Sequence, residues 1–173
     1  MIDFVPDRTG TGHDVRRASV RHGWQHVLRC VGIATDLGGG DMVHGVILFT
    51  IINANTTLLR LSNGDKDYDS LHGGVADDTL RKPVSVYAVA RRLGLPYETV
   101  RRHVGKLIEE GRCIRMGPRG GVIVPASAIE QMRPNVVIQD SLDALDELII
   151  SLDRVGALRP RTQDEVDRSV MIG

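Results

Sequence analysis

The stretch VSVYAVARRLGLPYETVRRHVGKLIEEGRCIRMGPRGGVIVP, residues 84–125, decides the fold. At its start, Ser85 is placed to cap a helix over residues 86–93, where apolar side chains recur at helical spacing. Residues 94–96 predict a tight turn. Gly94 can adopt the positive φ that ends a helix, and Pro96 is favourable in the first turn of the next helix.

A second helix is expected over residues 97–110, and on a helical wheel Val100, Val104 and Leu107 share one face, which predicts a core contact. Two helices joined by a short turn form a helix-turn-helix, and a helix about 12 Å across fits the DNA major groove. We predict DNA contacts by residues off the apolar face: Tyr97, Glu98, Thr99, Arg101, Arg102 and Lys106. The alternative is an ordinary solvated face, in which Glu98 pairs with Arg102.

A β-hairpin is predicted after the second helix. Residues 113–116 and 122–124 are short runs of strand-forming residues, separated by a glycine-rich segment. A hairpin at this place is a wing. Arg119 at its tip is expected to rest on a phosphate or enter a minor groove, and Arg115 near its base is a further candidate DNA contact.

Residues 84–125 resemble the winged helix-turn-helix of bacterial transcriptional regulators, with LGLPYETV as the turn and RRHVGKLIEEG as the second helix. Two long helices before this module and one after it resemble the multiple-antibiotic-resistance (MarR) type, although the linker before the module is longer than in that type. The resemblance implies a mostly α fold with a small β-hairpin wing. It also implies flanking terminal helices that form a homodimer, and double-stranded DNA as the partner.

Apolar periodicity predicts long helices outside the module over residues 16–36, 41–61 and 136–156, with Asp41 as the cap of the second. The predicted organisation is an N-terminal helical region at 1–61, a linker at 62–82, the winged module at 83–125, and a C-terminal helical region with a tail at 126–173. A short helix is expected at 125–132. The first 13 residues are polar and contain glycine, and residues 157–173 are polar and are expected to be frayed.

The zero net charge of the chain conceals a strong segregation. Residues 81–121 hold ten lysines and arginines against three glutamates, so this segment carries +7 and the remainder −7. Residues 42–61 are apolar, but His44, Asn53, Asn55 and Arg60 interrupt them, which favours a helix buried in a core or subunit interface over a membrane span. Two cysteines and no signal peptide indicate the cytoplasm.

These features predict a sequence-specific, homodimeric transcriptional regulator, with an effector-responsive role left open because Trp24 and His44 serve equally well as pocket or core. The alternative function is a winged-helix module for protein interaction or assembly, without specific DNA binding. The sequence leaves the operator, the effector and the direction of regulation undetermined.

No enzyme, cofactor or metal site is expected. Nucleophile and base groupings are absent from the sequence pattern, and residues 65–69 imitate a calcium loop but lack its glycine and glutamate at the required places. His22, His26 and Cys30 lie at intervals of four, yet the outer two are about 12 Å apart on a straight helix, so a structural role is favoured over zinc. For His103, packing or a phosphate contact is favoured over a pH switch.

Overall fold

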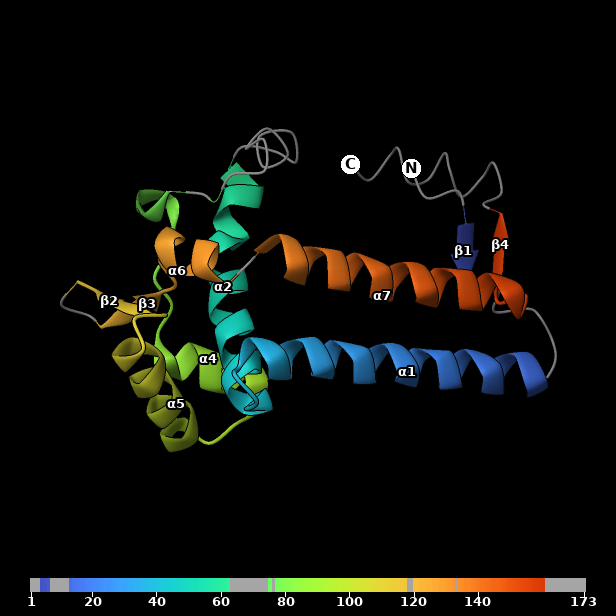
Figure 1. The fold of residues 1–173 in the computed structure, drawn as a ribbon, viewed down its shortest axis with the longest axis horizontal. Helices are drawn as coiled ribbons and strands as arrows, with labels where there is room; N and C mark the ends of the chain where they lie inside the picture. Colours follow the sequence, from blue (N-terminus) through green and yellow to red (C-terminus); the bar gives the residue numbers. More distant parts are fainter. Residues whose placement is uncertain are drawn as a thin grey trace. The chain divides into compact units, whose positions relative to one another are not determined.

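The computed structural model describes residues 4–6, 13–62, 75, 77–117, 120–132 and 134–160 (Figure 1). It is mostly helical, with a small antiparallel hairpin after two short helices. The chain falls into two compact units: a hairpin unit, Val31–Gln139, and a terminal unit that joins Met1–Cys30 to Asp140–Gly173. The long helices α1 (His13–Leu37) and α7 (Pro134–Arg154) each have residues in both.

The turn between α4 (Val86–Leu93) and α5 (Tyr97–Glu109) forms as its residues predict. The Ser85 side chain accepts a hydrogen bond from the backbone N–H of Ala88 at 3.1 Å. Gly94 ends α4 in the left-handed conformation with a φ of 65°, where glycine is least strained. Gly111 has a φ of 71° after α5, so the expected end of that helix is confirmed.

Helix α2 (Met42–Ser62) supplies the centre of the hairpin unit's core. Ile47, Leu48 and Ile51 are fully buried, and the core also takes residues from both short helices: Val86, Val89, Ala90, Val100, Val104 and Leu107. Asp41 caps α2, accepting a hydrogen bond from the backbone N–H of His44 at 3.0 Å. The expectation of a helix buried in a core is therefore confirmed for α2.

The hairpin joins β2 (Ile114–Met116) to β3 (Gly121–Ile123) in an antiparallel register that pairs Ile114 with Ile123. Both strands begin one residue away from the expected ranges. Cys113 is excluded from β2 because its N–H bonds back to the carbonyl of Leu107 at the end of α5, at 3.0 Å. Beyond the hairpin, α6 (Ala126–Gln131) is the expected short helix.

Asn55 of α2 ties the hairpin to the core. Its side-chain amide donates to the carbonyls of Lys82 at 2.7 Å and Val122 at 3.2 Å. Its side-chain oxygen accepts from the N–H of Val124 at 3.0 Å. Because Asn55 is fully buried, these bonds replace water for polar groups that would otherwise be unsatisfied.

In the terminal unit, β1 (Phe4–Pro6) pairs antiparallel with β4 (Leu158–Pro160). The expectation that residues from 157 onward are frayed is therefore wrong for Leu158–Pro160. Three-residue strands that each end in proline carry no recognisable alternation, so only their partner, far along the sequence, reveals them. A 3-10 turn, η1 (Asp78–Leu80), lies inside the expected linker.

Within the described residues, no single helix is long and apolar enough to cross a membrane; α1 and α2 reach that composition only as a bent pair. The calcium-like run at 65–69 lies outside the described residues.

Candidate nucleic-acid interface

Helix α5 separates an apolar face from a polar one, as the wheel predicts. Val100, Val104 and Leu107 are 0% exposed and belong to the core. Tyr97, Glu98, Arg101, Arg102 and Lys106 are all exposed, and Thr99 is partly buried. The structure therefore brings six of the predicted DNA contacts together on the outer side of one helix.

Glu98 forms an ion pair on this surface, but with Arg101 and not with Arg102. The Nε of Arg101 lies 2.7 Å from Oε2 of Glu98, a spacing of three residues along the helix. This hydrogen bond, with the attraction between the charges, raises the pKa of Arg101. The expected pairing of Glu98 with Arg102 is thus replaced by the neighbouring arginine, and the ion pair occupies Arg101.

Gly105 lies between Arg102 and Lys106 in sequence and presents only backbone. A Cβ atom built at Gly105 would meet nothing within 4 Å, so neighbouring atoms do not require a glycine there. A partner approaching this side of α5 can come closer to the backbone at Gly105 than at any residue with a side chain.

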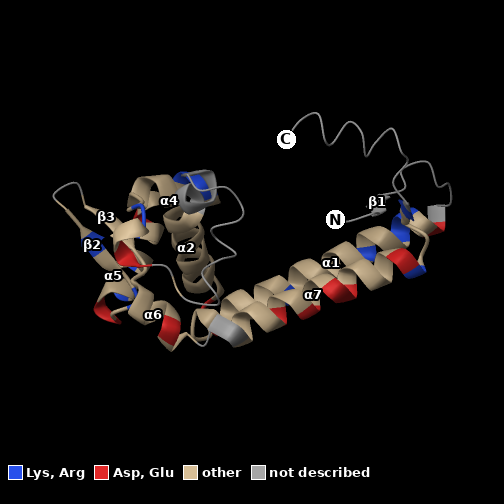
Figure 2. Ribbon diagram, turned by 90° about the horizontal axis from the view of Figure 1, so that it is seen from above, with Lys and Arg blue, Asp and Glu red and all other residues tan. Residues whose placement is uncertain are grey.

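The hairpin contributes Arg115, which is exposed on β2. Arg119 lies outside the described residues, so its predicted contact at the wing tip stays a prediction. The charge view shows basic positions on α4, α5 and β2 of the hairpin unit, whereas acidic positions recur along α7 (Figure 2). The basic and acidic segments counted along the sequence therefore lie on different helices and strands.

Helix α4 adds exposed residues that the sequence argument did not assign to a surface: Tyr87, Arg91 and Arg92. They border an open hollow of about 610 Å³, whose remaining lining residues are Thr50, Ala54, Val84, Ala88 and Val89. The charge count along the sequence includes both arginines. Their position beside an exposed aromatic ring was not predicted, because it depends on how α4 packs against α2.

His103 points away from the outer side of α5, which removes it from the predicted phosphate contacts. It is 7% exposed, and its Nδ1 atom lies 3.2 Å from Nδ1 of His44 on α2, which is 4% exposed. The packing role expected for His103 is confirmed. No local pattern points to this partner, because His44 precedes His103 by 59 positions.

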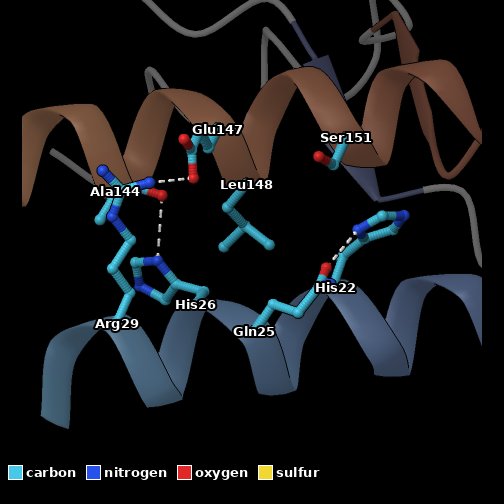
Figure 3. Close-up of a pocket in the computed structure, with 8 residues that line it drawn as sticks. All are labelled: His22, Gln25, His26, Arg29, Ala144, Glu147, Leu148 and Ser151. Carbon is cyan, nitrogen blue, oxygen red and sulfur yellow. Dashed lines mark hydrogen bonds and ion pairs between the residues drawn. The ribbon is translucent and has the colours of Figure 1, made fainter. Parts of the chain in front are cut away.

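A second hollow lies in the terminal unit, between its portions of α1 and α7 (Figure 3). Its volume is about 300 Å³, and eight residues line it: His22, Gln25, His26, Arg29, Ala144, Glu147, Leu148 and Ser151. Arg29 forms an ion pair with Glu147. Nδ1 of His26 donates to the carbonyl of Ala144 at 3.1 Å.

These contacts give His26 the structural role expected for it, since its bond to α7 joins the two helices of the terminal unit. The Sγ atom of Cys30 lies 3.5 Å from Nε2 of His26. Trp24 is 64% exposed on α1, so it does not belong to a core within the described chain. Among the described residues, no three histidines, cysteines or acids are arranged to hold a metal ion.

Comparison of the chain with models of protein families, with curated proteins and with solved structures finds no match.

Proposed function

We propose that the chain is a sequence-specific regulator of transcription that binds double-stranded DNA as a homodimer. One observation carries the proposal: α5 buries Val100, Val104 and Leu107 while Arg102 and Lys106 stand exposed on the same helix, which is followed by an antiparallel hairpin. A helix supported in this way can enter a major groove while its apolar face stays in the core.

The two cations on the outer side of α5 suit different tasks. The guanidinium of Arg102 can donate two parallel hydrogen bonds to O6 and N7 of guanine. Lys106 is a point charge better suited to a phosphate oxygen. Arg101, paired with Glu98 at 2.7 Å, would have to leave that carboxylate before it contacts DNA.

Exposed apolar residues of the terminal unit support a second copy of the chain as the partner there. They lie on α1 and α7 and include Val20, Trp24, Leu28, Leu142, Leu145 and Ile149. Large apolar side chains in such numbers are unusual on a surface that stays in water.

The alternative is a module for protein interaction that uses the same helices and hairpin. The charge distribution favours DNA, because the +7 segment coincides with α4, α5 and the hairpin. The sequence leaves an effector-responsive role open, and neither Trp24 nor His44 lines the 300 Å³ hollow of the terminal unit.

The test is selection of bound fragments from sheared genomic DNA by the purified full chain, followed by sequencing. The proposal expects an enriched motif of two inverted half-sites, with centres about 10 base pairs or a multiple apart, as a symmetric dimer requires. Recovery of fragments in the same proportions as the input, together with no salt-dependent affinity for any duplex, would favour the interaction module instead.

A further inference from the structure

The buried pair of His44 and His103 joins α2 to α5 through a hydrogen bond that depends on protonation. The two Nδ1 atoms are 3.2 Å apart, and the ring centroids are 5.5 Å apart. An imidazole nitrogen donates only when it carries a proton and accepts only when it does not. The bond therefore requires one protonated and one unprotonated Nδ1.

The neighbouring carboxylates fix which nitrogen donates when both rings are neutral. Nε2 of His44 lies 3.2 Å from Oε2 of Glu110, and because a carboxylate oxygen accepts, this Nε2 carries the proton. The Nδ1 atom of a neutral His44 is then the acceptor, so Nδ1 of His103 is the donor.

A first added proton leaves this bond intact, since it can bind to Nε2 of His103 while Nδ1 continues to donate. A second added proton must go to Nδ1 of His44. Both Nδ1 atoms would then carry hydrogen, and two positive rings would face each other with little access to water. The pair thus accommodates one positive charge and is broken by two.

Charged groups from each element packed here act on the pair. Asp41, at the start of α2, has its pKa lowered chiefly by the hydrogen bond from the backbone N–H of His44, and its Oδ2 atom lies 3.8 Å from Nδ1 of His103. Burial lowers the pKa of His103, Asp41 opposes this, and His44 then adds to the lowering.

Further cations surround the carboxylates and the α5 side of the pair. Arg102 and Lys106 each lower the pKa of His103. Arg112 lies 3.9 Å from Glu110 and also donates to the carbonyl of Leu37 at the end of α1, at 2.6 Å. The net surroundings of His103 therefore disfavour its charged form.

We propose that the His44 and His103 pair is a proton-sensitive contact between α2 and α5, which holds α5 in place while the pair carries at most one added proton and releases it when both rings are charged. The inference rests on the proposed function, because α5 is the helix assigned to DNA. It deepens that function by naming protons as regulators of DNA binding.

The sign of the effect on stability follows from the lowered pKa of His103. Below the ordinary histidine pKa of about 6.5, the unfolded chain binds a proton that the folded chain resists. The contribution of His103 to the free energy of unfolding is therefore at its maximum above about pH 6.5. It decreases as the pH drops from about 6.5 toward the pKa of His103 in the folded chain. DNA affinity falls only with the second proton, because the neutral pair and the singly charged pair both keep α5 in place.

The test uses the full chain in two measurements, one of which needs no DNA. Nitrogen-detected NMR of the imidazoles between pH 8 and pH 5 should show the pair titrating in two separate steps, with the α5 amide signals changing only at the second. Affinity for the selected duplex should fall by up to about tenfold per pH unit below the second step, the limit for one linked proton.

His103→Asn is the informative variant, because its amide nitrogen can donate to His44 but does not titrate. We expect its affinity for DNA to stay constant to within about twofold over this pH range. The control, His22→Asn, changes a histidine of the terminal unit and should behave as the wild type. His44→Asn, whose amide oxygen can accept from His103, serves if the first variant does not fold.

Two results would overturn the inference: both rings gaining protons without any change in the α5 signals, or His103→Asn losing affinity in acid as steeply as the wild type. Failure to bind DNA at any pH would contradict the proposed function instead. In that case the NMR titration alone decides whether the second proton releases α5.

Discussion

Arg102 and Lys106 lie four residues apart on the exposed side of α5. The proposed function assigns a base contact to Arg102 and a phosphate contact to Lys106. Arg102→Ala should weaken binding to the selected duplex by about 1 to 3 kcal/mol and binding to a scrambled duplex by much less, because it removes a base contact. Equal losses on both duplexes would mean that Arg102 does not read a base.

Lys106→Ala is the matched variant for a phosphate contact. It should lower affinity for every duplex and reduce the slope of affinity against salt concentration by roughly one, since one fewer counterion is released. Anisotropy titrations of both variants at several salt concentrations measure these quantities. An unchanged salt slope would exclude Lys106 from the interface.

Asn55 should be important for stability, because its removal takes the partner from the carbonyl of Lys82 and from the N–H of Val124, whereas the carbonyl of Val122 keeps its hydrogen bond from the N–H of Val84. We expect Asn55→Ala to lower the free energy of unfolding by about 2 to 4 kcal/mol in urea denaturation. Glu109→Ala, at an exposed position on α5, is the control and should change it by less than about 0.5 kcal/mol. Similar midpoints for the two variants would show that the bonds of Asn55 contribute little.

Single residues show where sequence reasoning stops. The buried and exposed positions of α5 could be predicted, because they depend only on helical periodicity. The pairing of Glu98 with Arg101 could not be chosen over Arg102, since both spacings bring side chains together on a helix. The partners of Asn55 and His103 are 27 or more positions away, beyond any local pattern.

At the scale of elements, the helices follow their end signals closely. Ser85 and Gly94 place both ends of α4 correctly, and Asp41 marks the start of α2. The terminal strands β1 and β4 were missed because each has only three residues, too few for a period of two to be recognised.

The two glycines at Gly94 and Gly105 should respond oppositely to alanine. Neither position has an atom within 4 Å of an added Cβ, so backbone conformation decides the outcome. Gly94→Ala forces a side chain into a φ of 65° and should destabilise the fold by about 1 to 2 kcal/mol. Gly105→Ala, inside α5, should stabilise it by about 0.5 to 1 kcal/mol.

Thermal or urea denaturation measures both effects, and DNA titration of the folded Gly105→Ala variant adds a second reading. If DNA approaches the backbone there, this variant is more stable but binds more weakly. Destabilisation by Gly105→Ala would contradict the unstrained helical backbone described at that residue.

For the whole molecule, the two helices and the hairpin of residues 84–125 could be predicted, but the packing of α2 against them could not. The apolar residues Ile47, Leu48 and Ile51 predict that this helix is buried, but they do not indicate which elements pack against it. Packing between distant segments depends on side-chain shape across the core, which periodicity does not describe. The apolar residues left exposed on α1 and α7 show where the described chain has no partner of its own.

Leu145→Asp should separate the proposed dimer into monomers, because it places a charge among the exposed apolar residues of α7. Sedimentation at micromolar concentration should give the wild type a mass near twice 19.0 kDa and the variant a mass near 19.0 kDa. Ser127→Asp, at an exposed position on α6, is the control and should remain dimeric. A wild type that sediments as a monomer contradicts the dimer.

Whether α5 binds DNA can be measured by a salt titration that compares the wild type with the triple variant Arg101→Ala, Arg102→Ala, Lys106→Ala. The wild type should bind duplex DNA with an affinity that falls steeply with salt. The folded triple variant should bind far more weakly, with a slope smaller by roughly one for each phosphate contact removed. Equal affinity and slope for the two proteins, or no salt-dependent binding by the wild type, would contradict DNA binding by α5.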